Sequence, residues 1–343
     1  MAGRGSEEVL ARLAPFEFAR SRTSHAGPDK VAAGRGPRRS SMNPLALLRA
    51  LRPHQWVKNV FVLAAVVFAY GEVGRVPPAG HADIVHALQA FFAFCMGASG
   101  IYLINDVLDI ASDRAHPTKC NRPIACGQVS VPVAIATSVV CIAAALFLGW
   151  LAGDRSWSVA MVVAGYITLN FAYSIQLKHL VLIDAFCIAS GFLLRIEAGG
   201  IAAHARISHW LMLCTLFLAL FLALCKRRAE IDLLGDGRGA HRANLREYTV
   251  PFLDQMVTVL AATTIVNYTM YTVAEETVTK FHSTNLVWSV PFVVFGIARY
   301  MFLVQTTKAA GNPTRVLLGG DAMFLVNALL WAGAVASALF LRP

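Results

Sequence analysis

Long apolar runs separated by short polar segments dominate the chain from about residue 56 to its end. Each run is about 17–25 residues long, enough for a helix to cross about 30 Å of hydrocarbon. No strand-type alternation of apolar and polar residues competes with them. The pattern predicts nine transmembrane helices, near residues 56–72, 85–104, 132–152, 156–175, 180–203, 207–225, 252–274, 284–304 and 322–341.

The composition supports the same class. Of the 343 residues, 57% are hydrophobic and 15% are charged, whereas a soluble domain is about 45–50% apolar and about 25% charged. The seven cysteines form no CxxC pair, and most of them lie inside apolar runs, where they are expected as small buried hydrophobes. We therefore predict an all-α polytopic membrane protein.

Residues 1–41 differ from the rest of the chain. They are rich in Gly, Ser, Arg and Ala and lack both apolar periodicity and the apolar core of a signal peptide. We predict a disordered N-terminal extension, followed by a single catalytic transmembrane domain over residues 42–343.

The charges suggest a topology. Cytoplasmic loops of membrane proteins carry an excess of Lys and Arg, and most of the 30 such residues here lie on the side of the N-terminus. We predict a cytoplasmic N-terminus in the cell (inner) membrane, and the net charge of +10 then needs no nucleic-acid partner. Five basic residues are predicted on the other side: Arg75, Arg155, Arg206, Lys280 and Arg342. The last one, Arg195, lies within a predicted span.

The first long cytoplasmic loop contains the densest group of acidic residues. Asp106, Asp109 and Asp113 are spaced i, i+3, i+7, which places them on one face if the second span continues as a helix. Such a stripe of hard oxygen ligands suits Mg²⁺ bridged to phosphates, and after a proline Lys119 and Arg122 could return as a phosphate clamp. The alternative is a solvated acidic helix end.

This motif, NDxxDxxxDxxHPxKxxRP, and the preceding RPxQWxKN at residues 52–59 resemble the UbiA superfamily of intramembrane prenyltransferases. The likeness runs from about residue 48 to the C-terminus and is closer to the superfamily's phosphoribosyltransferase branch. It implies a UbiA-like bundle of nine helices, in which Mg²⁺ is held against a diphosphate by Asn105, Asp106, Asp109 and Asp113.

The second long cytoplasmic loop supports that branch. Many aromatic prenyltransferases carry a second DxxxD motif there, whereas this chain has Lys226, Arg227 and Glu230 in a KRxxE pattern. Phosphoribosyl pyrophosphate and a lipid phosphate bring more phosphate groups, which require more cations. The alternative is charge that only sets topology. Further along the loop, the substrate-binding prediction includes Arg246 and Tyr248.

Two smaller polar groups are also predicted to bind substrate. Near the first span, polar residues share one helical face at a spacing close to i, i+3, i+7 and are predicted to line the side of the lipid phosphate: Arg52, Gln55, Lys58 and Asn59. The second group, at the start of the fifth span, comprises Tyr173, Lys178 and Asp184. Arg195 and Glu197 lie deeper and are predicted to form structural ion pairs.

The predicted reaction transfers a phosphoribosyl group from phosphoribosyl pyrophosphate to a polyprenyl phosphate drawn from the bilayer. The alternative within the superfamily moves a polyprenyl group from its diphosphate to an aromatic or other lipid acceptor. A transporter or lipid-binding scaffold is disfavoured, because the charge gathers at one face and no repeat is evident. The sequence leaves open the isoprenoid chain length and the oligomeric state, a homo-oligomer included.

Overall fold

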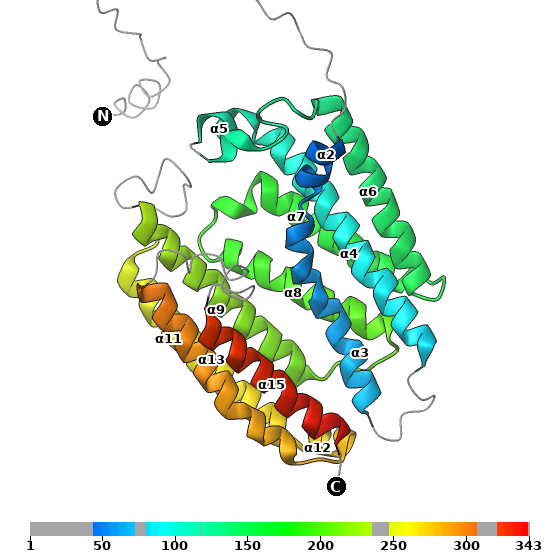
Figure 1. The fold of residues 1–343 in the computed structure, drawn as a ribbon, viewed down its shortest axis with the longest axis vertical. Helices are drawn as coiled ribbons and strands as arrows, with labels where there is room; N and C mark the ends of the chain where they lie inside the picture. Colours follow the sequence, from blue (N-terminus) through cyan, green and yellow to red (C-terminus); the bar gives the residue numbers. More distant parts are fainter. Residues whose placement is uncertain (1–43, 73–79, 117, 235–246, 307–320, 342–343) are drawn as a thin grey trace, which may run out of the picture. The chain divides into compact units, whose positions relative to one another are not determined.

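The apolar runs form helices in the computed structural model, which describes residues 44–72, 80–116, 118–234, 247–306 and 321–341 (Figure 1). Within these ranges the chain contains α-helices and short 3₁₀-helices and no β-strand, which confirms the all-α prediction. The long helices are α4 (His81–Leu108), α6 (Val131–Ala152), α7 (Ser158–Ile175), α8 (Ile183–Ala202), α9 (His209–Leu234), α11 (Val250–Val273), α13 (Val290–Thr306) and α15 (Ala322–Phe340). The predicted extension, residues 1–41, lies outside the described residues.

Eight helical segments in the described ranges are long and apolar enough to cross a membrane. They correspond to eight of the nine predicted spans. The remaining one, predicted at 56–72, is divided into a 3₁₀-helix, η1 (Pro53–Val60), and a short α-helix, α3 (Phe61–Gly71). Polar Lys58 and Asn59 lie in the 3₁₀ part, so the prediction of one uninterrupted apolar helix was wrong for this segment.

Short elements complete the polar loops. They are α2 (Pro44–Leu51), α5 (Ile110–Ala115), η2 (Lys119–Asn121), η3 (Leu177–His179), α12 (Glu275–Phe281) and η6 (Asn285–Ser289). Successive long helices run in opposite directions, so α4, α7 and α9 end where α6, α8 and α11 begin (Figure 1). We refer to that end of the bundle as the site end, because the acidic motif at the end of α4 and the KRxxE residues near the end of α9 both lie there.

Small residues allow the helices to approach closely. A Cβ on Gly199 of α8 would lie 2.0 Å from the carbonyl oxygen of Val62 on α3, and one on Gly100 of α4 would lie 2.9 Å from Cγ1 of Ile142 on α6. Small residues at helix contacts are typical of membrane bundles, where close packing replaces hydrophobic drive. The contact at Gly199 fixes α3 against α8 and thereby positions the polar η1 segment.

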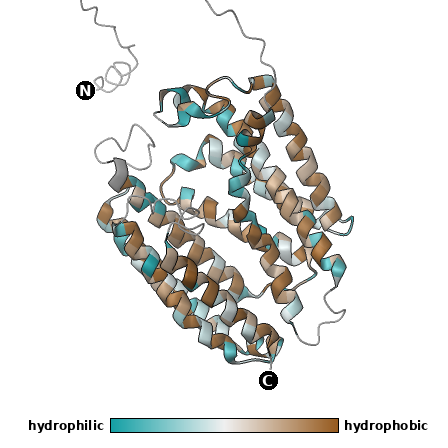
Figure 2. Ribbon diagram, viewed as in Figure 1, coloured by the Kyte–Doolittle hydropathy of each residue, from teal (hydrophilic) through white to brown (hydrophobic). Residues whose placement is uncertain are grey.

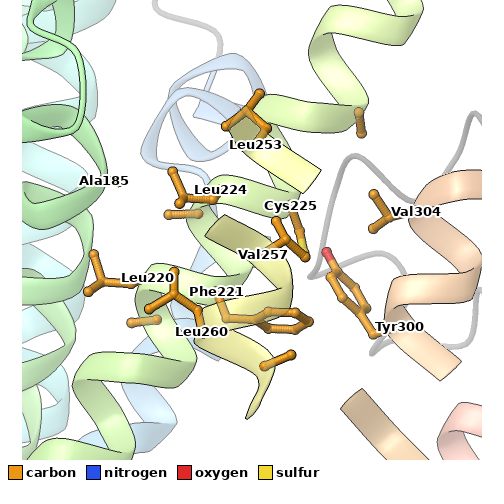
Figure 3. Packing of buried hydrophobic residues seen from close by; sticks show 14 of the residues in the cluster. Ala185, Leu220, Phe221, Leu224, Cys225, Leu253, Val257, Leu260, Tyr300 and Val304 are labelled. Atoms are coloured by element: carbon orange, nitrogen blue, oxygen red, sulfur yellow. The ribbon is translucent and has the colours of Figure 1, made fainter. Parts of the chain in front are cut away.

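The largest buried apolar cluster lies among α8, α9, α11 and α13 (Figure 3). Phe221 of α9 meets Tyr300 of α13 edge to face, with ring centroids 5.9 Å apart. Other large apolar side chains point outward, among them Val140 and Leu329, and hydropathic colouring shows the polar residues mainly near the helix ends (Figure 2). This distribution suits a protein with lipid around its helices, and the chain is a multi-pass membrane protein.

Candidate active site

The acidic motif lies where α4 gives way to α5. The chain keeps its helical backbone bonds there, from Asp109 N to Asn105 O at 2.9 Å and from Asp113 N to Asp109 O at 2.8 Å. However, α4 ends at Leu108, and the hydroxyl of Ser112 donates to the Asp109 carbonyl at 2.9 Å. Such side-chain bonds compete with the helical ladder. The predicted continuous helix is interrupted at Asp109, and the Asp109 carboxylate has a different partner from those of Asp106 and Asp113.

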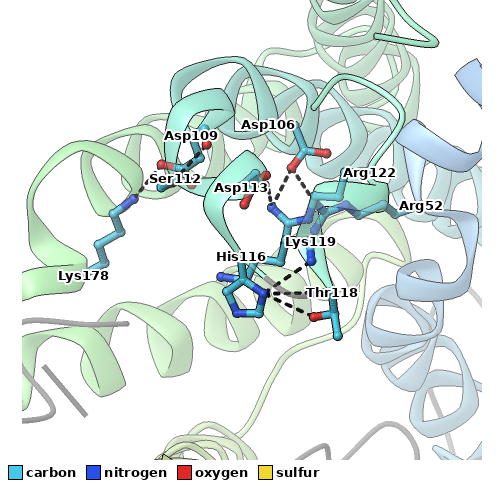
Figure 4. Close-up of polar contacts among 10 residues, drawn as sticks. All are labelled: Arg52, Asp106, Asp109, Ser112, Asp113, His116, Thr118, Lys119, Arg122 and Lys178. Carbon is cyan, nitrogen blue, oxygen red and sulfur yellow. Dashed lines mark hydrogen bonds and ion pairs between the residues drawn. The ribbon is translucent and has the colours of Figure 1, made fainter. Parts of the chain in front are cut away.

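Asp106 and Asp113 share one arginine (Figure 4). Arg122 Nη1 lies 3.1 Å from Asp106 Oδ1 and 2.7 Å from Asp113 Oδ2, and Arg52 Nη2 lies 2.5 Å from the same Asp106 oxygen. Both aspartates are buried, with 1% and 2% of their surface exposed. Buried carboxylates require such partners, and here two arginines from distant segments meet two buried acids.

The turn after α5 brings Arg122 to the carboxylates. His116 is extended, as expected before the proline at position 117, and its Nδ1 accepts the backbone N–H groups of Thr118 and Lys119 at 3.2 and 3.3 Å. The chain then folds back, and Arg122 N bonds to Lys119 O at 2.9 Å. The predicted return of Arg122 is thus observed, whereas Lys119 is exposed.

Arg52 reaches Asp106 through an unusual backbone conformation. Its φ of 55° and ψ of 56° are left-handed, which costs a non-glycine residue about 1–3 kcal/mol. The guanidinium lies over the Tyr102 ring of α4, 5.0 Å from its centroid, and pairs with Asp106. These two contacts offset the strain and hold the start of η1 against α4.

Asp109 faces the opposite way. Its Oδ1 lies 3.5 Å from Nζ of Lys178 on η3, and both side chains are partly exposed. Figure 4 shows Lys178 approaching from the side away from Arg52. The predicted Lys178 therefore does reach the acidic motif, through the one carboxylate that Arg122 does not contact.

The site contains oxygen donors suited to a hard divalent cation. Asn105, the residue before Asp106 in the sequence, has a buried Oδ1 without a hydrogen-bond partner. Across the described ranges, no three His, Cys, Asp or Glu side chains converge closely enough to make a ready metal site. The donor set itself, amide and carboxylate oxygens, is the chemistry that Mg²⁺ prefers, so the residues fit such an ion.

A second polar network joins α8, α9 and the start of α11. Arg227 Nε lies 2.8 Å from Asp184 Oδ2, in ion-pair contact without hydrogen-bond alignment, and Arg227 Nη1 contacts Glu230. Arg227 and Asp184 are 1% and 0% exposed, whereas Glu230 and Lys226 are more open. The Arg227 guanidinium is therefore held by two carboxylates, and its predicted contact with phosphate stays a prediction. Lys226 lies 3.9 Å from Glu230.

Tyr248 secures this network. Its hydroxyl donates to Asp184 Oδ1 at 3.0 Å and accepts the backbone N–H of Leu182 at 2.7 Å. Leu182 has a positive φ of 64°, a conformation that this hydrogen bond helps to retain. Burial, with a smaller contribution from the Asp184 carboxylate, raises the pKa of Tyr248 to about 12. The sequence predicted substrate binding for Tyr248. No local pattern indicated its hydrogen bond to Asp184, 64 positions away.

Replacing Tyr248 with Phe should destabilise the protein, because it leaves Asp184 Oδ1 and the Leu182 N–H short of a partner, a loss of about 1–3 kcal/mol. The pKa of Tyr248 is raised above its usual value of about 10. Its stabilising effect is therefore complete below pH 10 and declines between about pH 10 and 12. Thermal melts in detergent should show that the melting temperatures of wild type and Tyr248→Phe differ by a constant amount from pH 7 to 9.5. This difference should become smaller above pH 10. An unchanged difference at pH 11.5 would contradict the prediction.

The structure links Arg195 to the first polar segment, which the sequence did not predict. Arg195 Nε donates to Asn59 Oδ1 at 2.8 Å, and its other nitrogens donate to Gly191 O at 2.7 Å and Tyr166 Oη at 2.9 Å. The predicted ion pair is wrong for Arg195, since within the described part of the chain its partners are neutral.

The remaining predicted residues are placed less distinctively. Gln55 is half-buried on η1, and Tyr173, near the end of α7, lies within electrostatic range of Arg227. The predicted Arg246 lies outside the described residues. The structure therefore brings together the acidic motif, Arg52, Arg122 and Lys178, and separately Asp184, Lys226, Arg227, Glu230 and Tyr248.

The fold and site define a polytopic helical membrane protein with buried acid–arginine clusters at one end. The chain matches the UbiA prenyltransferase family over residues 59–328 and belongs to that family. It is 38% identical to a decaprenyl-phosphate phosphoribosyltransferase of Corynebacterium glutamicum, over 87% of each chain. It is 34% identical to that of Mycolicibacterium smegmatis, over 86% of this chain and 92% of the relative.

The fold is shared with a solved structure at low sequence identity. A UbiA homologue from Archaeoglobus fulgidus, bound to GPP and Mg²⁺, superposes with a TM-score of 0.64 at 18% identity. The match covers 86% of this chain and 99% of that one. The likeness confirms the UbiA-type helical bundle that the sequence motifs implied.

Proposed function

We propose that this protein transfers the 5-phosphoribosyl group of phosphoribosyl pyrophosphate to a polyprenyl phosphate and releases pyrophosphate. The observation that carries the proposal is that basic side chains gather around the acidic motif at one end of the bundle. Arg52 and Arg122 contact Asp106, Lys178 contacts Asp109, and the KRxxE motif follows on α9. The curated relatives named as decaprenyl-phosphate phosphoribosyltransferases support it.

A divalent cation, Mg²⁺ by preference, is part of the proposal. Asn105, Asp106, Asp109 and Asp113 would hold it, since they supply oxygen donors and Asn105 Oδ1 is buried without a hydrogen-bond partner. The Archaeoglobus fulgidus homologue with Mg²⁺ bound adds support from the same fold. When bound, the ion neutralises charge on the pyrophosphate leaving group.

The chain's own residues position the reactants. Arg122, Lys119, Lys226 and Lys178 bind phosphate oxygens, and Arg52 holds Asp106 in place. The C1–O bond of ribose to pyrophosphate breaks, and a phosphate oxygen of the lipid forms the new bond to C1. That nucleophile is already ionised near neutral pH, so positioning and charge stabilisation provide the catalysis without a strong general base.

The KRxxE network has a supporting part in this scheme. Arg227, fixed by Asp184 and Glu230, orients the Glu230 carboxylate toward ribose hydroxyls or a second ion. Tyr248 holds Asp184 in the same network. Tyr173 and Arg246 complete the substrate-binding set proposed from the sequence.

The proposal also covers where the lipid acceptor binds and how the protein is oriented in the membrane. Arg52, Gln55, Lys58 and Asn59 lie on or next to η1 and face the lipid phosphate. The polyprenyl chain stays in the bilayer, and the site end faces the cytoplasm in the inner membrane, as the excess of basic residues on that side supports.

A paired-substrate assay tests the function. Purified protein with Mg²⁺ receives either phosphoribosyl pyrophosphate with a polyprenyl phosphate, or a prenyl diphosphate with an aromatic acceptor. We expect consumption of the first pair, with pyrophosphate released in equal amount to the lipid product. Consumption of the second pair alone would instead identify a prenyltransferase.

A further inference from the structure

Arg195 of α8 is a buried cation that no carboxylate among the described residues neutralises. It is 6% exposed, and its three hydrogen-bond acceptors are an amide, a carbonyl and a phenol oxygen. Its guanidinium also lies over three aromatic rings, including Tyr166 at 4.6 Å and Phe192 at 5.5 Å from the ring centroids. Within the described residues it forms no ion pair. A charge in such surroundings calls for a counter-ion.

Lys58 of η1 adds a second positive charge beside Arg195 and so increases the excess of positive charge there. It is half-buried and adjoins Asn59, whose Oδ1 accepts from Arg195. Three cations act on it electrostatically, Arg52, Arg195 and Lys226, of which Arg52 and Lys226 have carboxylate partners of their own. Nowhere in the described part of the chain does Lys58 make an ion pair or hydrogen bond. Like charges in a low-dielectric interior repel strongly, so an anion would stabilise this group.

The surroundings indicate what kind of anion fits. The residues directly after Asn59 turn apolar side chains outward, with Val60 50% and Phe61 39% exposed. Phe61 packs edge to face on Phe192, 5.2 Å between centroids, and Phe192 also contacts Arg195. Within four residues the chain therefore passes from a buried cation group to an apolar surface. A ligand with a phosphate head and a hydrocarbon tail matches both parts.

We propose that Lys58, with Arg195 behind it, binds the phosphate monoester group of a polyprenyl lipid that enters from the bilayer. This inference rests on the proposed function, in which that phosphate is the acceptor. It assigns the two substrates to different places: the diphosphate to the acidic motif, and the lipid phosphate to Lys58 and Arg195, neither of which pairs with a carboxylate among the described residues. Arg195 is a positioning residue, since it holds Asn59 and, through it, the segment that carries Lys58.

Binding of farnesyl phosphate to the purified full-length protein, without metal or phosphoribosyl pyrophosphate, tests the proposal. Wild type should bind farnesyl phosphate more tightly than farnesol or inorganic phosphate. Lys58→Gln should weaken farnesyl phosphate binding by about tenfold or more, and Lys58→Arg by about threefold or less, because the charge is kept. Lys280→Gln is the matched control, since Lys280 pairs with Glu72 at 3.2 Å near the opposite end of the bundle, and it should bind as wild type does.

Unchanged farnesyl phosphate affinity in Lys58→Gln would overturn the proposal, as would inorganic phosphate binding as tightly as the lipid. Melting curves of each variant confirm that it is folded before binding is measured. The result is separate from the proposed function. A wild-type protein that binds farnesyl phosphate through Lys58 but transfers no phosphoribosyl group would contradict the reaction and leave this site standing.

Discussion

Asp106→Asn is expected to lower turnover by about 100- to 1,000-fold, the range found when one charge-stabilising group is removed from an active site. Asp106 is buried and contacts both Arg52 and Arg122, and the residue before it, Asn105, has a buried Oδ1 without a hydrogen-bond partner. The amide keeps the shape but removes the charge that holds two arginines and would hold a divalent ion. Initial rates of pyrophosphate release, measured across a Mg²⁺ titration, provide the readout.

Asp83→Asn is the matched control. Asp83 lies on the first turn of the same helix, is also buried, and accepts from Gly80 N at 2.9 Å. This variant should retain turnover within about twofold, because Asp83 lies at the opposite end of α4 from the acidic motif, so its replacement acts mainly on stability. Near-normal turnover by a folded Asp106→Asn would defeat the assignment of the acidic motif.

Asp184→Ala is expected to produce the largest loss of stability, about 3–5 kcal/mol, the range for removing one partner of a buried ion pair. The change leaves Arg227, 1% exposed, with Glu230 as its remaining carboxylate, and it removes the acceptor of the Tyr248 hydroxyl. Equilibrium unfolding in mixed micelles, or the melting temperature in detergent, measures the loss.

The Asp254→Ala variant distinguishes the effect of burial on stability from the effect of ion pairing alone. Asp254 also accepts from an arginine, Arg228, at 2.7 Å, but its side chain is 45% exposed. Because the Asp254 carboxylate is open to solvent, the pair is expected to contribute about 0–1 kcal/mol, so this variant should melt near wild type. In the double variant Asp184→Leu with Arg227→Met, removal of both charges should recover part of the lost stability. Equal losses in Asp184→Ala and Asp254→Ala would contradict the account.

The helices and the acidic motif were predictable because both are encoded locally. Apolar runs of spanning length predicted eight helices near their observed positions. The spacing of the motif predicted a shared face, which is observed for Asp106 and Asp113 but not for Asp109. The proline after His116 predicted the returning turn that carries Arg122. In each case the residues that make the feature are close together in the sequence.

The partners across the bundle were not predictable. Arg195 meets Asn59 across 136 positions, and Tyr248 meets Asp184 across 64. No periodicity encodes such pairs, since they depend on how α3 and α8 pack at Gly199 and on where α11 begins. The interruption of the helix at Asp109 was not predicted either, because no proline or glycine marks that position in the sequence.

The most direct test of the central claim, phosphoribosyl transfer to a lipid phosphate, follows labelled phosphate from the donor into the products. Phosphoribosyl pyrophosphate labelled with ³²P on the 5-phosphate, and separately on the β-phosphate, is incubated with the protein, Mg²⁺ and a polyprenyl phosphate. Phosphoribosyl transfer predicts that the 5-phosphate label moves into the lipid phase while the β-phosphate label stays in water as pyrophosphate. Absence of 5-phosphate label from the lipid, or entry of the β-phosphate label into it, would contradict the account.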